Sequence, residues 1–197
     1  MNATIAFAMC GSFCTFERAL DEAQRLVENG ARLVPVMSTA AARTDTRFGS
    51  SAAFRARLAQ LGSAALIDTV AAAEPLGPRG LAQALLVAPC TGNTLGKLAC
   101  GITDTPVVMA AKSLLRTGRP VILALSTNDG LSASLQNIGR LMNTKNIYFV
   151  PFRQDDPLRK PCSLQADFSL LERAVESALA GRQLQPVLLA AQGGVHG

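Results

Sequence analysis

Short apolar runs that alternate with stretches of helical periodicity constrain the fold of this chain more than any other feature. Runs of this kind are typical of strands buried on both faces, and their alternation with helices predicts a parallel sheet with right-handed crossovers. The predicted fold class is therefore α/β, a doubly wound parallel sheet in a flavodoxin- or Rossmann-like three-layer sandwich. The predicted strands span residues 4–9, 32–37, 65–68, 83–88, 120–125 and 147–150.

Helical patterns fill most of the intervals between these runs. No repeat or linker divides the chain, so we expect one domain over residues 1–189 and a flexible, glycine-rich tail over residues 190–197. Residues 44–51 are expected to form a loop, and residues 69–78, with two prolines, an irregular segment. The predicted helices span residues 13–29, 52–61, 94–99, 106–115, 131–142 and 167–179, the last capped by Asp167 or Ser169.

The segment Ala88–Lys97 carries the strongest sign of ligand binding. It reads Ala-Pro-Cys-Thr-Gly-Asn-Thr-Leu-Gly-Lys, and the preceding strand is expected to stop at Pro89. Ligands of open α/β sheets bind outside the carboxyl ends of the strands, where small residues let the backbone approach a planar or phosphorylated group. Thr91, Asn93 and Thr94 add hydrogen-bonding groups without bulk. The sequence therefore predicts a small-molecule site at this loop.

Short polar residues also follow other predicted strands. Gly11-Ser12 follows the first, Ser38-Thr39 the second, and Ser126-Thr-Asn-Asp129 the fifth. Each is ordinary turn chemistry by itself, and Gly11-Ser12 can be either a helix cap or an anion site at a helix N-terminus. Because parallel strands end at one edge of a sheet, we expect these residues and the loop after Ala88 to share one ligand site.

Two common nucleotide-binding motifs are incomplete. The turn after the first strand holds only Gly11 where a dinucleotide fold needs G-x-G-x-x-G. Residues 92–97 have one residue too few between their glycines for a P-loop, and Leu98 replaces the hydroxyl that would bind magnesium. We therefore exclude NAD binding of the usual type and ATP hydrolysis.

Composition narrows the function further. The net charge is +5 but the basic residues are scattered, which favours an anionic ligand over nucleic acid. The five cysteines form no paired framework and the only histidine, His196, lies in the expected tail, so we expect reduced thiols and no metal site. Cys90 can be a nucleophile, but without a histidine as its base we favour a packing role. No signal peptide or membrane helix is apparent, so we expect a cytoplasmic protein.

At these strand ends the chain resembles the flavoprotein family that contains the homo-oligomeric FMN-containing cysteine decarboxylases. The P-A-S-A-N-T motif of that family stands here as Pro89-Cys-Thr-Gly-Asn-Thr94, beside the Gly-Ser turn and the Ser/Thr after the second strand. The resemblance implies FMN as cofactor, its phosphate held by Gly11, Ser12 and Ser38 or Thr39. It implies that the rest of the cofactor is held by Cys90, Thr91, Asn93, Thr94 and Ser126.

Longer motifs are similar to those of one branch of this family, the B subunits of dipicolinate synthases. They are Ala124–Leu131, Asn137–Leu141, Asn143–Phe152, Gln154–Pro157 and Lys160-Pro161. This resemblance implies a part in the oxidation of a dihydrodipicolinate-type precursor to dipicolinate during sporulation. It also implies a homo-oligomer, a small dicarboxylate substrate, and a separate A subunit that binds NADP.

Two other functions stay open. One is a non-catalytic scaffold that binds the A subunit through residues 143–161. The other is an independent FMN-dependent cysteine decarboxylase, but those enzymes carry a P-x-M-N-x-x-M-W type motif and this chain has no tryptophan. No residue is identified for proton or hydride transfer. Lys97, Lys145 and Arg153 are hypothetical partners for the carboxylates of the substrate.

Overall fold

The central strands are apolar along nearly their whole length because the sheet is covered on both faces. The computed structural model describes residues 1–190 and confirms the α/β fold class. Its parallel strands are ordered β2-β1-β3-β4-β5, the doubly wound order in which the strand sequence reverses between β1 and β3. They are β1 (Thr4–Met9), β2 (Arg32–Met37), β3 (Ala84–Cys90), β4 (Val121–Thr127) and β5 (Ile147–Phe149).

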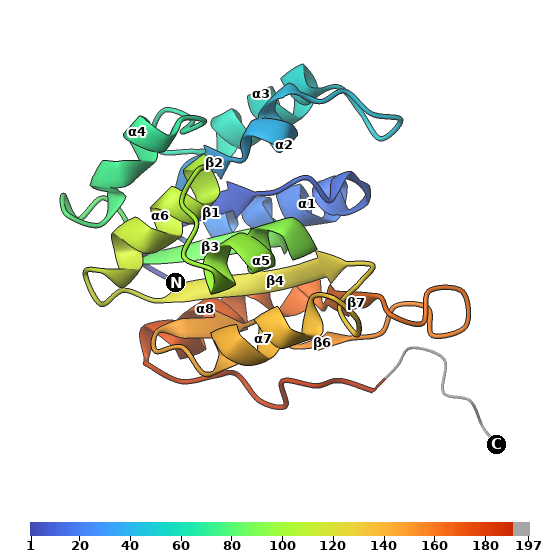
Figure 1. The fold of residues 1–197 in the computed structure, drawn as a ribbon. Coiled ribbons are helices and arrows are strands. Elements are labelled where there is room, and N and C mark those ends of the chain that lie inside the picture. The colour runs from blue at the N-terminus through green and yellow to red at the C-terminus, as the bar shows by residue number, and fades with distance from the viewer. Residues whose placement is uncertain (191–197) are drawn as a thin grey trace.

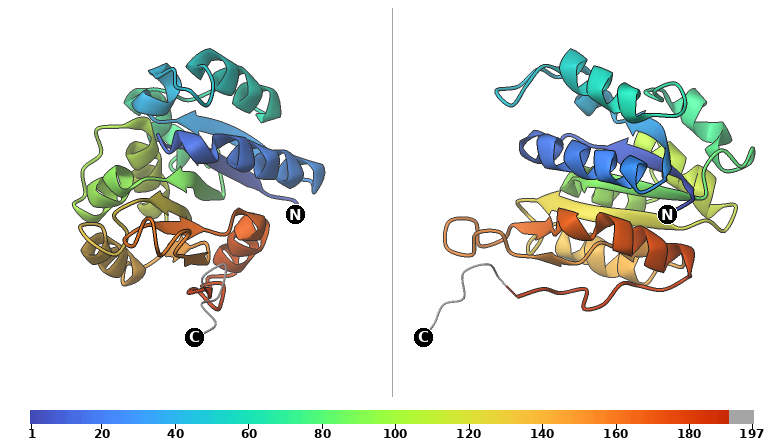
Figure 2. Two further views of the ribbon diagram at one scale, coloured as in Figure 1. Left: turned by 90° about the vertical axis from the view of Figure 1, so that its right-hand side faces the viewer. Right: turned by 180° about the vertical axis from the view of Figure 1, so that it is seen from behind.

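Helices form a layer on each face of this sheet (Figure 1). On one face lie α5 (Gly92–Ala99), α6 (Pro106–Leu115) and α7 (Leu135–Met142). The view from behind shows α1 (Phe16–Glu28) and α8 (Leu171–Leu179) on the other (Figure 2, right). Beyond the β2 edge lie α2 (Thr39–Arg43), α3 (Ser51–Leu61) and α4 (Val70–Ala73). No helix within residues 1–190 is long and apolar enough to cross a membrane.

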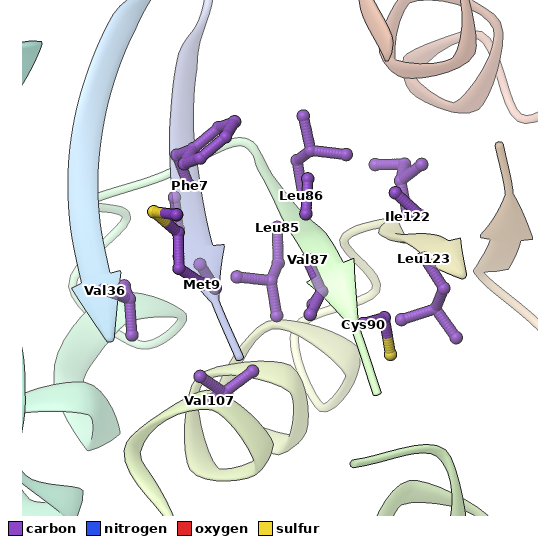
Figure 3. Close-up of a cluster of buried hydrophobic side chains, with 14 of the residues drawn as sticks. Phe7, Met9, Val36, Leu85, Leu86, Val87, Cys90, Val107, Ile122 and Leu123 are labelled. Atoms are coloured by element: carbon purple, nitrogen blue, oxygen red, sulfur yellow. The ribbon is translucent and has the colours of Figure 1, made fainter. Parts of the chain in front are cut away.

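The central strand β3 shows why these strands read as unbroken apolar runs. All of its residues are buried. Leu85 and Val87 lie on the side that faces Val107 of α6, whereas Leu86 lies on the other side with Phe7 (Figure 3). Successive residues of a strand point to opposite faces, so a strand covered on both faces needs an apolar residue at every position.

After β5 the chain returns over the end of the sheet. β6 (Phe152–Arg153) pairs antiparallel with β7 (Leu164–Ala166), and β7 pairs antiparallel with Ser126 and Thr127 of β4. β5 occupies the first part of the same β4 edge, at Val121–Leu123. The outer edge of β4 is therefore shared by a parallel and an antiparallel partner, and residues 154–163 form a loop beyond the strand ends.

Two strand predictions are wrong. Residues 65–68 form no strand, since only Ile67 bridges β2, at Val36. The strand expected to stop at Pro89 continues to Cys90, with a register shift after Val87. Proline has no N–H to donate to the neighbouring strand, and the register shift accommodates this missing hydrogen bond. Its carbonyl still accepts a hydrogen bond from the Cys10 amide at 3.2 Å.

Two helix starts differ from the prediction because a turn precedes each helix. The helix predicted over residues 131–142 begins only at Leu135, because the amides of Ser132 and Ser134 donate to the Asp129 carbonyl in a preceding turn. The last helix begins as a 3-10 turn, and Asp167 accepts from the Ser169 amide there. The helices α2 and α4 and the strands β6 and β7 were not predicted. Residues 191–197 of the expected tail, with His196, lie outside the described residues.

Gly130 permits the close contact between the turn after β4 and β7. A Cβ atom at this position would lie 2.6 Å from Leu164 Cγ and 2.7 Å from Leu164 Cβ. We predict that Gly130→Ala lowers the free energy of unfolding by about 1–3 kcal/mol, because the buried Leu164 side chain has to move. Urea denaturation measures this change.

Gly139→Ala in α7 is the matched control, because a Cβ there meets nothing within 4 Å. Alanine favours a helix over glycine, so this variant is expected to gain about 0.5–1 kcal/mol. Equal stability of the two variants would contradict the close contact at Gly130.

Candidate functional site

A polar cavity of about 420 Å³ opens at the carboxyl ends of β1, β3 and β4. Its volume is in the range of small-molecule sites. The inner wall comes from Gly11-Ser12, from Thr91-Gly92 and from residues 126–128. The outer wall comes from the return segment, residues 155–165. Figure 2, left, views the sheet from this end.

Two serine hydroxyls join the ends of β1 and β4 across the inner wall. Ser12 Oγ lies 2.7 Å from Ser126 Oγ, and either atom can be the donor. Each hydroxyl has one hydrogen and two lone pairs, so the pair retains hydrogen-bonding capacity toward the cavity. The two serines can therefore bind a polar group of a ligand.

Threonines build the turn between β3 and α5. Thr91 is the N-cap of α5, and its Oγ1 accepts from the Thr94 amide at 3.3 Å. The Thr94 hydroxyl donates to Cys10 Sγ at 3.2 Å and is buried beneath the turn. Of these two side chains, only Thr91 lines the cavity.

A polar cluster packs against Gly92 in the same turn and leaves no room for a side chain at this position. Asp129 Oδ1 accepts hydrogen bonds from the hydroxyls of Thr127 and Ser134, the latter at 2.9 Å. A Cβ on Gly92 would lie 2.7 Å from Asp129 Oδ1 and 2.8 Å from each of the two hydroxyl oxygens. A carboxylate beside the first turn of α5 also interacts favourably with the helix dipole. This cluster fixes the position of the wall at Thr91-Gly92.

The predicted site residues divide into two groups. Gly11, Ser12, Thr91 and Ser126 line the cavity. The others do not: Ser38 caps α2 by accepting from the Ala41 amide at 3.2 Å, Cys90 and Thr94 are buried, and Thr39 and Asn93 are exposed. Ser38 and Thr39 are nevertheless near the first turn, because a Cβ on Gly11 would lie 3.7 Å from the Ala40 Cβ at the start of α2.

Two buried thiols lie below the site. Burial raises the pKa of the Cys10 thiol to about 11, in spite of the hydrogen bond from Thr94. Burial also raises the pKa of Cys90, and the neighbouring Cys10 adds to this rise. Thiols that stay protonated are poor nucleophiles, so both serve as packing residues. Among residues 1–190, no group of three or more His, Cys, Asp or Glu side chains is placed to hold a metal ion.

Sequence reasoning missed the charged residues of the cavity: Arg18, Asp155 and Lys160. Arg18 Nη1 donates to Gln165 Oε1 at 3.3 Å, and Lys160 Nζ donates to Asp155 Oδ2 at 3.3 Å. These residues come from α1 and from the return segment, which are far apart in the sequence and meet at the hydrogen bond from Arg18 to Gln165. Two sequence signals point to this segment: the many polar residues within residues 143–157, and the resemblance of residues 154–161 to the motifs of dipicolinate synthase B subunits.

The cations suggested for the substrate carboxylates do not line this cavity, although Arg153 lines the small hollow beside it. Lys97 Nζ forms an ion pair with Asp104 at 2.7 Å, and Arg153 pairs with Asp167. Lys145 borders a different hollow, beside the start of β5. None of these three cations lines the cavity at the strand ends, where the cationic side chains are those of Arg18 and Lys160.

Comparison with known proteins agrees with the sequence motifs. The family model named Flavoprotein matches residues 1–167. The B subunit of dipicolinate synthase from Bacillus subtilis (strain 168) is 45% identical over 185 residues, which cover 94% of this chain and 92% of that protein. The crystal structure of the corresponding B subunit from Bacillus halodurans matches with a TM-score of 0.88 and 43% identity, covering 97% of this chain and 100% of that one. A dodecameric FMN-dependent Ubix-like decarboxylase from Escherichia coli O157:H7 shares the fold, with a TM-score of 0.60 and 22% identity over 75% of this chain and 79% of its own.

The reactivity of the cysteines tests their burial in this structure. We predict that iodoacetamide labels Cys14 and Cys100, which are exposed, and spares Cys10 and Cys90, which are buried. A thiol with a pKa of about 11 is ionised in only about one molecule in a thousand at pH 8. Peptide mass spectrometry after brief labelling measures the pattern, with denatured protein as the control in which every cysteine reacts. Labelling of Cys10 as fast as Cys100 would contradict the burial.

Proposed function

Because the chain belongs to the Flavoprotein family, we propose that its cavity holds FMN and that the protein works as the B subunit of a dipicolinate synthase. The observation that carries this proposal is the position and lining of the cavity. It lies at the strand ends of a doubly wound sheet, and hydroxyls from three of these ends line it. The similarity to the Bacillus subtilis protein extends over nearly the whole of both chains.

The residues present suit a phosphorylated, planar ligand. Ser12, Thr91 and Ser126 offer hydroxyls to phosphate or carbonyl oxygens, and Gly11 and Gly92 allow close approach of the backbone. Arg18 and Lys160 add positive charge to the cavity, which favours an anionic substrate beside the cofactor. FMN bound here would supply a centre that accepts hydride.

The substrate in this proposal is a small dicarboxylate, a dihydrodipicolinate-type precursor that is oxidised to dipicolinate during sporulation in the cytoplasm. Arg18 and Lys160 bind its carboxylates, since both line the cavity and both form charge-assisted hydrogen bonds. The mixture of neutral hydroxyls on the inner wall and charged groups on the outer wall gives each ligand its own part of the cavity.

An A subunit that binds NADP completes the reaction, in agreement with the missing G-x-G-x-x-G fingerprint. Residues 143–161 run from the start of β5 at one end of the sheet to the cavity loop at the other. A partner bound along this segment is placed beside the cavity. The protein also forms a homo-oligomer in this proposal, as the dodecameric relative does.

We predict that the protein binds FMN and that the double substitution Ser12→Ala, Ser126→Ala weakens binding about tenfold. Each hydroxyl contributes a hydrogen bond of about 0.5–1.5 kcal/mol, and 1.4 kcal/mol corresponds to a factor of ten. Titration of FMN fluorescence measures the dissociation constant. Ser177→Ala in α8, whose hydroxyl donates to the Arg182 carbonyl instead, is the control. Unchanged FMN fluorescence with the wild-type protein would remove FMN from the proposal.

We predict that Arg18→Ala and Lys160→Ala each raise the KM for the dicarboxylate precursor about 10- to 100-fold in the synthase assembled with its A subunit. Hydrogen bonds to charged groups contribute about 1.5–3 kcal/mol. Steady-state kinetics measures the effect. Lys97→Ala, which breaks the surface pair with Asp104, is the matched control and is expected to leave KM unchanged. Equal kinetics in all three variants would favour the scaffold function instead.

A further inference from the structure

Asp155 is a carboxylate with too few hydrogen-bond donors around it. Within residues 1–190, its Oδ1 atom is buried without a partner. Its Oδ2 atom receives the Lys160 ammonium at 3.3 Å, the long end of the hydrogen-bond range. An ionised carboxylate has about four acceptor sites, and leaving such a site unsatisfied in a buried position is costly. The described structure therefore leaves this group with capacity for a further donor.

The charge of Asp155 persists at neutral pH. Burial raises the pKa of its carboxyl group, but the Lys160 ammonium and the neighbouring Ser163 hydroxyl, which donates its hydrogen bond to the Thr127 carbonyl, outweigh burial and hold the pKa below its ordinary value. The side chain is 23% exposed and lines both the main cavity and a small adjoining hollow. Because Oδ1 itself is buried, a ligand in the cavity approaches this carboxylate from the side of Oδ2.

Asp155 also neighbours both cations of the cavity. It contacts Lys160 directly, and it shares the adjoining hollow with Arg18. Asp155 thus lies with Arg18 and Lys160 along the cavity, while the other two charged groups of the adjoining hollow, Arg153 and Asp167, are paired with each other. A nitrogen heterocycle with a carboxylate on each side of its nitrogen carries the complementary pattern, provided that the nitrogen bears a hydrogen.

We propose that Asp155 accepts a hydrogen bond from the ring N–H of a reduced heterocyclic dicarboxylate whose carboxylates are bound by Arg18 and Lys160. This inference rests on the proposed function and names the substrate class of the same site. The N–H belongs to the reduced ring, either as an enamine or as a protonated imine. The nitrogen of the aromatic product carries a lone pair and no hydrogen. It is therefore an acceptor facing the acceptor oxygen of Asp155, and no hydrogen bond forms between them. Asp155 therefore determines specificity, favouring the reduced substrate and the release of the product.

Isothermal titration calorimetry of the full chain with three probes tests this proposal. At neutral pH the ring nitrogen of piperidine-2,6-dicarboxylate is a secondary ammonium with N–H donors, that of dipicolinate carries a lone pair, and isophthalate has C–H at the same place between its carboxylates. We expect the wild-type protein to bind the piperidine about 10- to 100-fold more tightly than dipicolinate. We also expect isophthalate to bind more tightly than dipicolinate, which isolates the ring nitrogen from overall charge.

Asp155→Asn is the diagnostic variant because its amide N–H can donate to the pyridine nitrogen. We expect dipicolinate to gain affinity relative to isophthalate and the piperidine to lose it. Asp104→Asn, which removes one negative charge from a surface ion pair, is the matched control and should leave the order unchanged. Equal weakening of all three probes by Asp155→Asn would reduce Asp155 to a support for Lys160 and overturn the proposal.

The wild-type order of affinities tests the proposal even if the variant does not fold, which thermal unfolding would reveal. Failure of the wild-type protein to bind any of the three dicarboxylates also overturns it. Titrations with and without FMN separate this inference from the cofactor. If the protein discriminates among the probes but does not bind FMN, the role of Asp155 is supported and FMN is excluded as the cofactor. If the protein binds FMN but does not discriminate among the probes, the cofactor is supported and the role of Asp155 is excluded.

Discussion

The pairing of β7 with the last two residues of β4 is the interaction on which the cavity depends. The register sets Gln165 opposite Ser126 and Leu164 opposite Thr127. Ser126 in turn contacts Ser12 at the end of β1, and Gln165 accepts from Arg18 of α1. One short antiparallel ladder thus aligns three segments that are far apart in the sequence. It also covers part of an edge that would otherwise offer unpaired backbone groups.

Hydrogen bonds beneath and beside the turn after β3 support the side chains that line the cavity. The bonds from Thr94 to Cys10, and from Thr127 and Ser134 to Asp129, satisfy polar groups below the turn and hold it in place. Buried networks whose groups are satisfied rigidify the structure around them. The hydroxyls of Ser12, Thr91 and Ser126 are thereby presented to the cavity by a fixed framework.

The fold could be predicted from the sequence because its signals are local. Apolar runs such as residues 32–37 and helical patterns such as residues 106–115 identify elements one at a time, and the rule for strand ends then locates the ligand edge. The outer wall could not be predicted. β6 and β7 have only two and three residues, too few for a periodic pattern, and Arg18 is one of several charged residues on an amphipathic helix. Proximity to the cavity, which no spacing encodes, distinguishes Arg18 from its neighbours.

The charges of the outer wall act most strongly when a ligand fills the cavity. Lys160 is 53% exposed and Asp155 is 23% exposed, so water screens their mutual attraction in the free protein. A ligand that occupies the cavity displaces this water and lowers the local dielectric constant, which strengthens each interaction between ligand and wall. The inner wall is lined mainly by neutral hydroxyls and backbone, so the strength of its interactions with a ligand depends little on the local dielectric constant. Discrimination between ligands of similar shape therefore depends on Arg18 of α1 and on Asp155 and Lys160 of the return segment.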